Sequence, residues 1–178
     1  MTEREIIRGC LANDRKVQKK LYDLYSPVLM GLCRRYITKK EDAEEILIES
    51  FYKIFSNIRQ FKGKGSFEGW MKRITVNESL MFLRKKYNFN VGLESSQVDL
   101  KTMPAAEQRL FENDILQLLD HLPTGYRTIF NLYVIEGYTH REVAEKLNIS
   151  INTSKSQLIH AKRRLRELIK KNEPAIAC

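Results

Sequence analysis

Residues 138–166 contain two amphipathic helical patterns separated by three residues, and this stretch constrains the fold more than any other. Thr139 and Glu142 match a capping box that starts the first helix. Its apolar face holds Val143, Ala144 and Leu147. The break falls at residues 148–150, and Ser150 is suited to cap the second helix. The inward stripe of that helix holds Ile151, Ser154, Leu158, Ala161, Leu165 and Leu168. The spacing predicts a helix-turn-helix.

The opposite face of the second helix carries hydroxyl, amide and cationic groups, which suit phosphates and base edges in a DNA major groove. It holds Thr153, Lys155, Ser156, Gln157, Ile159, His160, Arg163 and Arg164. The cationic run at residues 162–164, with Arg166, favours DNA reading. The alternative is a helical hairpin that only packs, with the charge run as a solvated face.

The composition points to a polyanionic partner. The chain has 178 residues, a net charge of +9 and a pI of about 9.5, so nucleic acid is the first candidate and an anionic membrane surface the second. No apolar run approaches the roughly 20 residues that span a bilayer, and the first ten residues lack a signal-peptide core. We therefore expect no membrane insertion and a cytoplasmic location.

No pattern in the sequence indicates catalysis, a metal or a cofactor. The three cysteines, Cys10, Cys33 and Cys178, are too far apart for a metal-binding knuckle or a CxxC pair, and their odd number argues against a disulfide framework. We expect Cys10 and Cys33 to be small core residues. The histidines have no apparent nucleophile or metal partners, so we expect a protein that is not an enzyme.

The rest of the chain is predicted to be almost entirely helical, which makes the fold class all-α. Apolar residues recur at helical spacing in residues 3–11, 16–36 and 41–58. In the second of these the buried stripe is expected to hold Leu21, Leu24 or Tyr25, Val28 or Leu29, Leu32 and Tyr36. Pro27 interrupts that pattern and is expected to kink or divide the helix near Ser26.

An acidic stripe is expected on the helix over residues 41–58. Asp42, Glu45 and Glu49 lie at i, i+3 and i+7, which places three like charges on one side of a helix in a basic chain. Nucleic acid would be repelled there. The stripe therefore indicates either a basic protein partner or a solvated surface.

Residues 60–70, with three glycines, two lysines and three aromatic residues, form the next break. Such a loop offers cations to a phosphate backbone and ring faces to unstacked bases. The alternative is a plain loop whose aromatic residues are anchored in a core. A helix is expected to follow from Phe67 to about Tyr87.

The helical period disappears over residues 88–105, which read as a flexible linker. The charge distribution agrees, because residues 1–87 hold 19 Lys and Arg against 11 Asp and Glu, and residues 109–178 hold 11 against 8. Between them, residues 88–108 hold one against three. We expect two small helical domains, 1–87 and 106–178, on either side of the linker.

Four blocks in this order resemble a bacterial RNA polymerase sigma factor of the extracytoplasmic-function (ECF) group, which has regions 2 and 4 only. The blocks are DAEEILIESFYKIF, FKGKGSFEGWMKRITVN, LPTGYRTIFNLYVIEGYTHREVAEKLNIS and TSKSQLIHAKRRL. The resemblance covers about residues 21–87 and 106–168. It implies a region 2 bundle and a region 4 helix-turn-helix that together read a promoter for core RNA polymerase and help to melt it.

The resemblance also implies roles for single residues. The core polymerase contacts would be Asp42, Glu45 and Glu49. The −10 element contacts would be Lys62, Lys64, Phe67, Trp70, Arg73 and Asn77, with Asn77 at a flipped base. The −35 element contacts would be Lys155, Ser156, Ile159 and His160 at bases, and Thr153, Arg163 and Arg164 at phosphates.

Some positions depart from the family pattern. Ile48 stands where a glutamine is usual, Gln157 and His160 replace frequent arginines, and Ser154 replaces a valine. The −35 preference of relatives therefore does not carry over. The expected partners are core RNA polymerase, promoter DNA and, as a further candidate, an anti-sigma factor. The alternatives are a stand-alone helix-turn-helix regulator and a basic helical RNA-binding protein.

Overall fold

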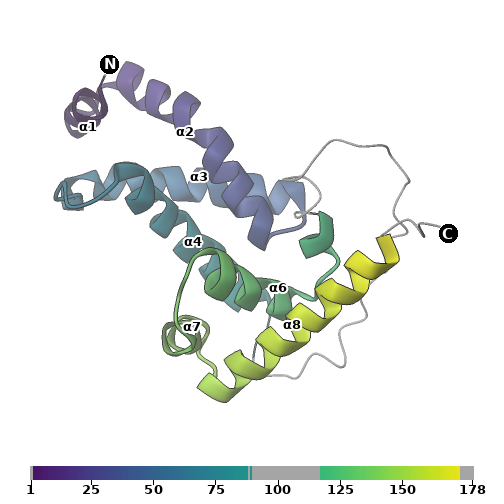
Figure 1. The fold of residues 1–178 in the computed structure, drawn as a ribbon. Coiled ribbons are helices and arrows are strands. Elements are labelled where there is room, and N and C mark those ends of the chain that lie inside the picture. The colour runs from purple at the N-terminus through teal and green to yellow at the C-terminus, as the bar shows by residue number, and fades with distance from the viewer. Residues whose placement is uncertain (1, 88, 90–116, 173–178) are drawn as a thin grey trace. The chain divides into compact units, whose positions relative to one another are not determined.

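The computed structural model describes residues 2–87, 89 and 117–172, and every regular element in these residues is a helix, which confirms the all-α prediction (Figure 1). The first five elements are α1 (Glu3–Leu11), α2 (Arg15–Tyr36), α3 (Lys40–Asn57), the 3-10 turn η1 (Ile58–Gln60) and α4 (Phe67–Lys86). The others are α6 (Thr124–Phe130), the π-helical η3 (Asn131–Ile135), α7 (His140–Leu147) and α8 (Ile151–Asn172). None of the described helices combines the length and the apolar character needed to cross a bilayer.

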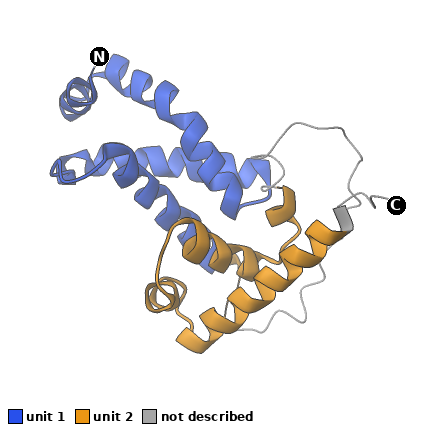
Figure 2. Ribbon diagram, viewed as in Figure 1, with its two compact units in different colours: residues 1–85 blue, residues 86–178 orange. Residues whose placement is uncertain are grey.

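The chain forms two compact units, residues 1–85 and 86–178 (Figure 2). The predicted linker 88–105 lies outside the described residues, apart from Phe89. Phe89 is buried, and its carbonyl accepts a hydrogen bond from Gln157 Nε2 at 3.3 Å. This residue therefore packs with the second unit. The domain boundaries remain a prediction.

Local signals set the start of the first unit. Thr2 and Glu5 form a capping box before α1, and the Asp14 carboxylate accepts hydrogen bonds from the first turn of α2. The two helices come very close at Gly9, because a Cβ there would lie 2.7 Å from both methyl carbons of Val17. Only glycine permits this approach.

The helix α2 runs through Pro27 without being divided. Pro27 is exposed, and Leu21 and Leu29 on either side of it are fully buried, so packing holds the helix together across the missing hydrogen bond. Of the two alternative pairs in the predicted stripe, the half-buried Tyr25 and the buried Leu29 lie inward, whereas Leu24 is 57% and Val28 44% exposed.

The core of the first unit combines apolar side chains from α2, α3 and α4. Three hydroxyls buried in it donate to carbonyls one turn earlier in their own helices, which satisfies them without a partner helix. These are Ser50 to Ile46, Thr75 to Met71 and Ser79 to Thr75, at 2.7, 3.1 and 2.9 Å. Cys10 and Cys33 are free and buried, as predicted. Burial raises the pKa of Cys33 to about 12, so its thiol stays protonated.

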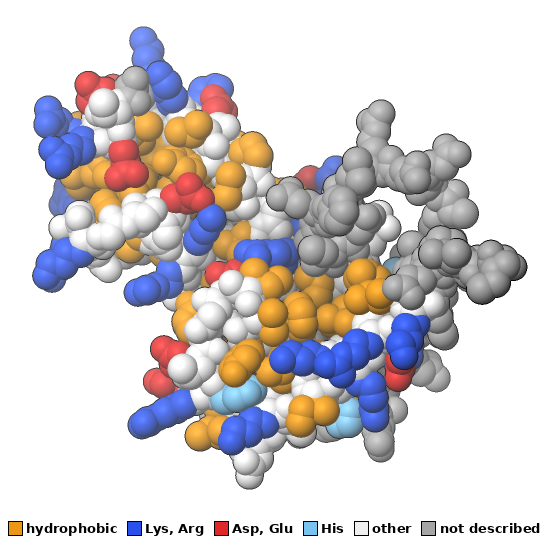
Figure 3. Space-filling model, in the orientation of Figure 1, with side chains coloured by type: hydrophobic (Ala, Val, Ile, Leu, Met, Phe, Trp, Pro, Cys, Tyr) orange, Lys and Arg blue, Asp and Glu red, His pale blue; other side chains and the backbone are white. Residues whose placement is uncertain are grey.

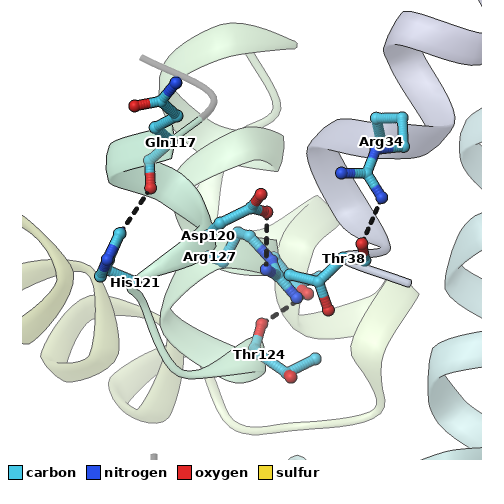
Figure 4. Close-up of polar contacts among 8 residues, drawn as sticks. Arg34, Thr38, Gln117, Asp120, His121, Thr124 and Arg127 are labelled. Carbon is cyan, nitrogen blue, oxygen red and sulfur yellow. Dashed lines mark hydrogen bonds and ion pairs between the residues drawn. The ribbon is translucent and has the colours of Figure 1, made fainter. Parts of the chain in front are cut away.

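The second unit is built around α8. Its Ala161 packs in a cluster with Leu119 and Leu122, and partly buried Tyr126, Phe130 and Leu165 lie against that cluster. Arg127 is also buried and forms an ion pair with Asp120 at 3.4 Å (Figure 4). Two further contacts in the same figure close helix ends: His121 Nδ1 lies 2.7 Å from the Gln117 carbonyl oxygen, and in the first unit Arg34 donates to the Thr38 carbonyl.

Candidate functional site

The helix-turn-helix forms at the predicted residues. Thr139 N donates to Glu142 Oε2 at 2.8 Å, and Glu142 N donates to Thr139 Oγ1 at 3.3 Å, which completes the capping box of α7. Asn148 ends α7 in the left-handed conformation, with φ 54°. Ser150 Oγ then accepts from Thr153 N at 2.9 Å and starts α8. The turn is therefore set by its own side chains.

A polar contact joins the two helices of the motif. His140 Nδ1 lies 2.9 Å from Ser154 Oγ, and the imidazole stacks on the Tyr133 ring at a centroid distance of 4.2 Å. Burial lowers the pKa of His140, and the charges of Lys155 and Lys162 on α8 lower it further. The neutral ring is favoured in this position.

The exposed face of α8 is cationic with an apolar centre. Ile159 is 66% exposed, and polar or charged side chains surround it at helical spacing. Figure 3 shows Lys and Arg side chains gathered over this helix. We call this surface the reading face, and it consists of Asn152, Lys155, Ser156, Ile159, Lys162, Arg163 and Arg166.

Four of the predicted −35 contacts lie on the reading face, and three lie at its edge. The four are Lys155, Ser156, Ile159 and Arg163. At the edge, Thr153 Oγ1 lies 2.8 Å from Ser150 Oγ, His160 stacks on Tyr126, and Arg164 forms an ion pair with Glu167 at 3.3 Å. These three are half-buried, so their access to DNA is more restricted than predicted.

The sequence assignment of this face was wrong at Gln157, which is 6% exposed and bonds to Phe89. Asn152, which that assignment left out, is exposed around Ile159, and so are Lys162 and Arg166 of the cationic run. These three residues lie at i−7, i+3 and i+7 from Ile159, so a helical projection of the sequence centred on Ile159 places all three on the same side as that residue.

The outward side of α3 is acidic at one end and apolar at the other. Glu45 and Glu49 are exposed as predicted, whereas Asp42 is half-buried. Ile48 and Tyr52, one turn apart, are 63% and 65% exposed. We call this surface the α3 face, and it consists of Glu41, Glu45, Ile48, Glu49 and Tyr52.

A third surface combines the loop before α4 with one side of that helix. Lys62 and Lys64 are exposed in the loop, where Gly63 and Gly65 adopt φ values of 69° and 87°. Ser66 Oγ accepts from Gly69 N at 3.1 Å and starts the helix. Trp70, Arg73 and Asn77 then follow at i, i+3 and i+7 on one side of α4, and the loop residue Phe61 contacts the Trp70 ring at a centroid distance of 5.6 Å.

Phe67, predicted as a −10 contact, is fully buried. Its ring stacks nearly parallel to Trp70 at 5.7 Å and contacts Phe61 at 5.1 Å and Tyr25 at 6.4 Å. Burying an aromatic ring among other rings is more favourable than exposing it in a loop. Phe67 therefore supports Trp70 from below and does not face solvent.

Each histidine is engaged by a protein group: His121 by the Gln117 carbonyl, His140 by Ser154, and His160 by Arg163, whose Nη2 lies 3.1 Å from its Nδ1. Among residues 2–87, 89 and 117–172, no group of three His, Cys, Asp or Glu side chains is placed to hold a metal ion.

Two family models match the chain. The model for sigma-70 region 2 matches residues 21–88, and the model for sigma-70 region 4 matches residues 112–165. These spans lie close to those that the sequence motifs predicted. The region 2 match contains the α3 face and the surface formed by the loop before α4 and one side of that helix. The region 4 match contains the reading face up to Arg163.

Similar proteins cover nearly the whole chain. The ECF RNA polymerase sigma-E factor of Haemophilus influenzae is 24% identical over 91% of this chain and 92% of its own length. The ECF RNA polymerase sigma factor SigW of Bacillus subtilis is 26% identical over 92% of this chain and 95% of its own length. Both alignments therefore run across most of this chain and most of each relative.

Solved structures share the fold. The sigma factor RpoE of Bartonella quintana, in complex with the anti-sigma factor NepR, superposes with a TM-score of 0.52 at 24% identity, over 87% of this chain and 98% of that chain. CnrH, in complex with the cytosolic domain of CnrY, also has a TM-score of 0.52, at 17% identity over 96% and 99% of the two chains.

Proposed function

Because the chain belongs to the sigma-70 family and, within it, to the ECF sigma factors, we propose that its two units divide the work of promoter recognition between them. As a sigma factor it binds core RNA polymerase and directs it to promoters for transcription initiation. The observation that supports this division of work is the exposed reading face, a cationic surface on the second helix of a helix-turn-helix.

In the second unit we assign the −35 element to the reading face. Lys155 and Ser156, near the N-terminal end of α8, have the donors and acceptors that base edges require. Lys162, Arg163 and Arg166 lie further along the same side, where their charges suit the phosphates that flank the groove. Thr153, His160 and Arg164 contribute from the edge.

In the first unit we assign the −10 element to the surface of the loop and α4. Lys62 and Lys64 approach the backbone, while Trp70 offers a ring that Phe67 holds in place. Asn77 supplies hydrogen bonds to the edge of an extruded base, and Arg73 lies between the two. This arrangement acts on unpaired DNA, which connects it with melting.

We assign core polymerase to the α3 face. Glu45 and Glu49 are exposed carboxylates that require a basic partner, and the adjacent Ile48 and Tyr52 leave apolar surface open to solvent. Asp42, half-buried, lies at the margin of this surface. A basic protein surface with apolar side chains complements both ends of the face, whereas DNA complements neither.

A stand-alone regulator explains the observations less well, because it leaves the region 2 match over residues 21–88 without a purpose. The proposed role is that of an initiation factor without enzymatic activity, and it places the chain in the cytoplasm with its polymerase and DNA. RpoE and CnrH are both bound to a second chain in the similar structures, and an anti-sigma factor is the further partner we propose.

Binding to purified core polymerase tests this function. We expect the wild-type chain to bind the core enzyme and to support run-off transcription from promoters mapped by sequencing transcript starts after overexpression. The Glu45→Lys, Glu49→Lys double variant is expected to bind core at least about tenfold more weakly, because like charges across an interface cost several kcal/mol.

The matched control reverses two other exposed carboxylates of the first unit, Glu3→Lys with Asp23→Lys, which changes the net charge equally. Asp23 forms an exposed ion pair with Lys19 at 2.7 Å, a kind of pair that contributes little stability. Equal core affinity of the two double variants would contradict the role of the α3 face. No core binding by the wild-type chain would contradict the proposed function itself.

A further inference from the structure

His140, at the start of α7, contacts side chains of two other elements. It is the first residue of α7, where side chains commonly face solvent. Here the ring is half-buried between two other elements, with Tyr133 of η3 against its face and Ser154 of α8 at its Nδ1. His140 therefore links three elements of the second unit.

Ser154 lies on the inward side of the first turn of α8 and contacts His140 there. Its side chain is fully buried, whereas Ile151, the other inward position of that turn, is 44% exposed. The apolar anchors Leu158, Ala161 and Leu165 lie further along α8, about 6, 10 and 16 Å from Ser154 at 1.5 Å per residue. The N-terminal end of α8 therefore depends on the contact with His140 more than the middle does.

The same end of α8 carries the residues assigned to base edges. Lys155 and Ser156 directly follow Ser154, so any movement of that turn moves both side chains with it. A hydrogen bond to a base edge is lost within less than about 1 Å of its optimum distance. A directional bond between His140 and Ser154 limits such movement, whereas an apolar contact permits sliding.

We propose that His140 is a positioning residue for promoter reading: through Ser154 and Tyr133 it holds the first turn of α8 in the register that Lys155 and Ser156 need. The inference rests on the proposed function of the reading face. His140 itself touches no base in this account, and its contribution is to sequence preference rather than to overall DNA affinity.

The test uses the full chain assembled with core polymerase. Duplexes with a fixed −10 element and a randomised −35 hexamer are bound and sequenced, and the ratio of the most enriched hexamers to scrambled ones measures preference. His140→Phe keeps a ring to stack on Tyr133 and loses the bond, and Ser154→Ala removes the bond from the other side. Each is expected to lower the ratio about two- to tenfold, the range of one hydrogen bond.

Three comparisons make the result specific. The variant with both substitutions is expected to be no worse than either single variant, because both remove the same bond. His121→Phe, the same change at a histidine bonded within its own segment, is expected to keep the wild-type ratio. Lys155→Ala, a direct contact, is expected to lower the ratio and confirms that the assay detects reading.

Circular dichroism and a urea midpoint, measured on each full-length variant, report whether the second unit is folded. If His140→Phe does not fold, Ser154→Ala carries the test by itself. A wild-type ratio in folded Ser154→Ala, or losses that add in the double variant, would overturn the positioning role. A wild-type chain without any preference in the −35 hexamer would instead contradict the proposed function.

Discussion

The reading face predicts a salt dependence that a single substitution changes by a known amount. Three of its exposed cations, Lys162, Arg163 and Arg166, are assigned to phosphates. If each neutralises one phosphate, the plot of log affinity against log salt has a slope of about −2.7, because each contact releases about 0.9 counterion. Between 50 and 200 mM salt, the affinity then falls by about 40-fold.

Arg166→Ala is expected to remove one of these contacts. The slope becomes about −1.8, and the affinity falls only about 12-fold over the same salt range. Arg166 is exposed and lies two turns beyond Ile159, so the substitution leaves the core of the second unit intact. Arg166 belongs to the cationic run of the sequence, and its exposure beside Ile159 makes it part of the reading face.

The assay is fluorescence anisotropy with a labelled duplex and a fragment of residues 86–178, whose helicity is checked by circular dichroism. The fragment begins where the second unit begins and keeps the bond between Phe89 and Gln157. Ser156→Ala is the control, because it removes a hydroxyl and no charge and is expected to keep the wild-type slope. An unchanged slope for Arg166→Ala would refute the assignment of that face to the phosphates.

Three further predictions concern melting, packing and pH. Asn77→Ala is expected to lower open-complex occupancy about five- to two-hundredfold, the range for hydrogen bonds to one base edge, as measured by permanganate reactivity with core enzyme; wild-type opening would remove Asn77 from the site. Gly9→Ala is expected to destabilise the first unit by about 1–3 kcal/mol, since the new Cβ meets Val17 at 2.7 Å. Gly31→Ala has open space around it and is expected to stabilise the unit by up to about 1 kcal/mol. The urea midpoints of unfolding distinguish the two variants. Burial lowers the pKa of His140 in the folded protein, so as the pH falls the unfolded chain binds a proton at this residue before the folded chain does. The contribution of the neutral ring to the free energy of unfolding is complete above about pH 6.5 and is expected to decline as the pH falls through the folded pKa. His140→Phe removes that part of the decline in urea midpoint, and an identical pH profile in the two proteins would contradict it.

Local signals in the sequence determined where helices begin and end. Thr139 and Glu142 start α7, Asn148 ends it, and Ser150 starts α8, all as predicted. Each of these signals is a contact between residues within a few positions of one another, so the sequence carries it without reference to the fold. The order of the family blocks likewise indicated both units before any contact between distant residues was known.

Only the tertiary structure decided which side chains are covered. Helical periodicity places Gln157 near the polar face of α8, but the Phe89 carbonyl, 68 residues away in the chain, draws it inside. The sequence left open whether Phe67 contacts DNA or is anchored in a core, and rings from Tyr25, Phe61 and Trp70 enclose it. The bond between His140 and Ser154 spans 14 residues and two helices. A period of 3.6 residues identifies a stripe, but neighbours from other elements determine its edges, and those neighbours exist only after the chain has folded.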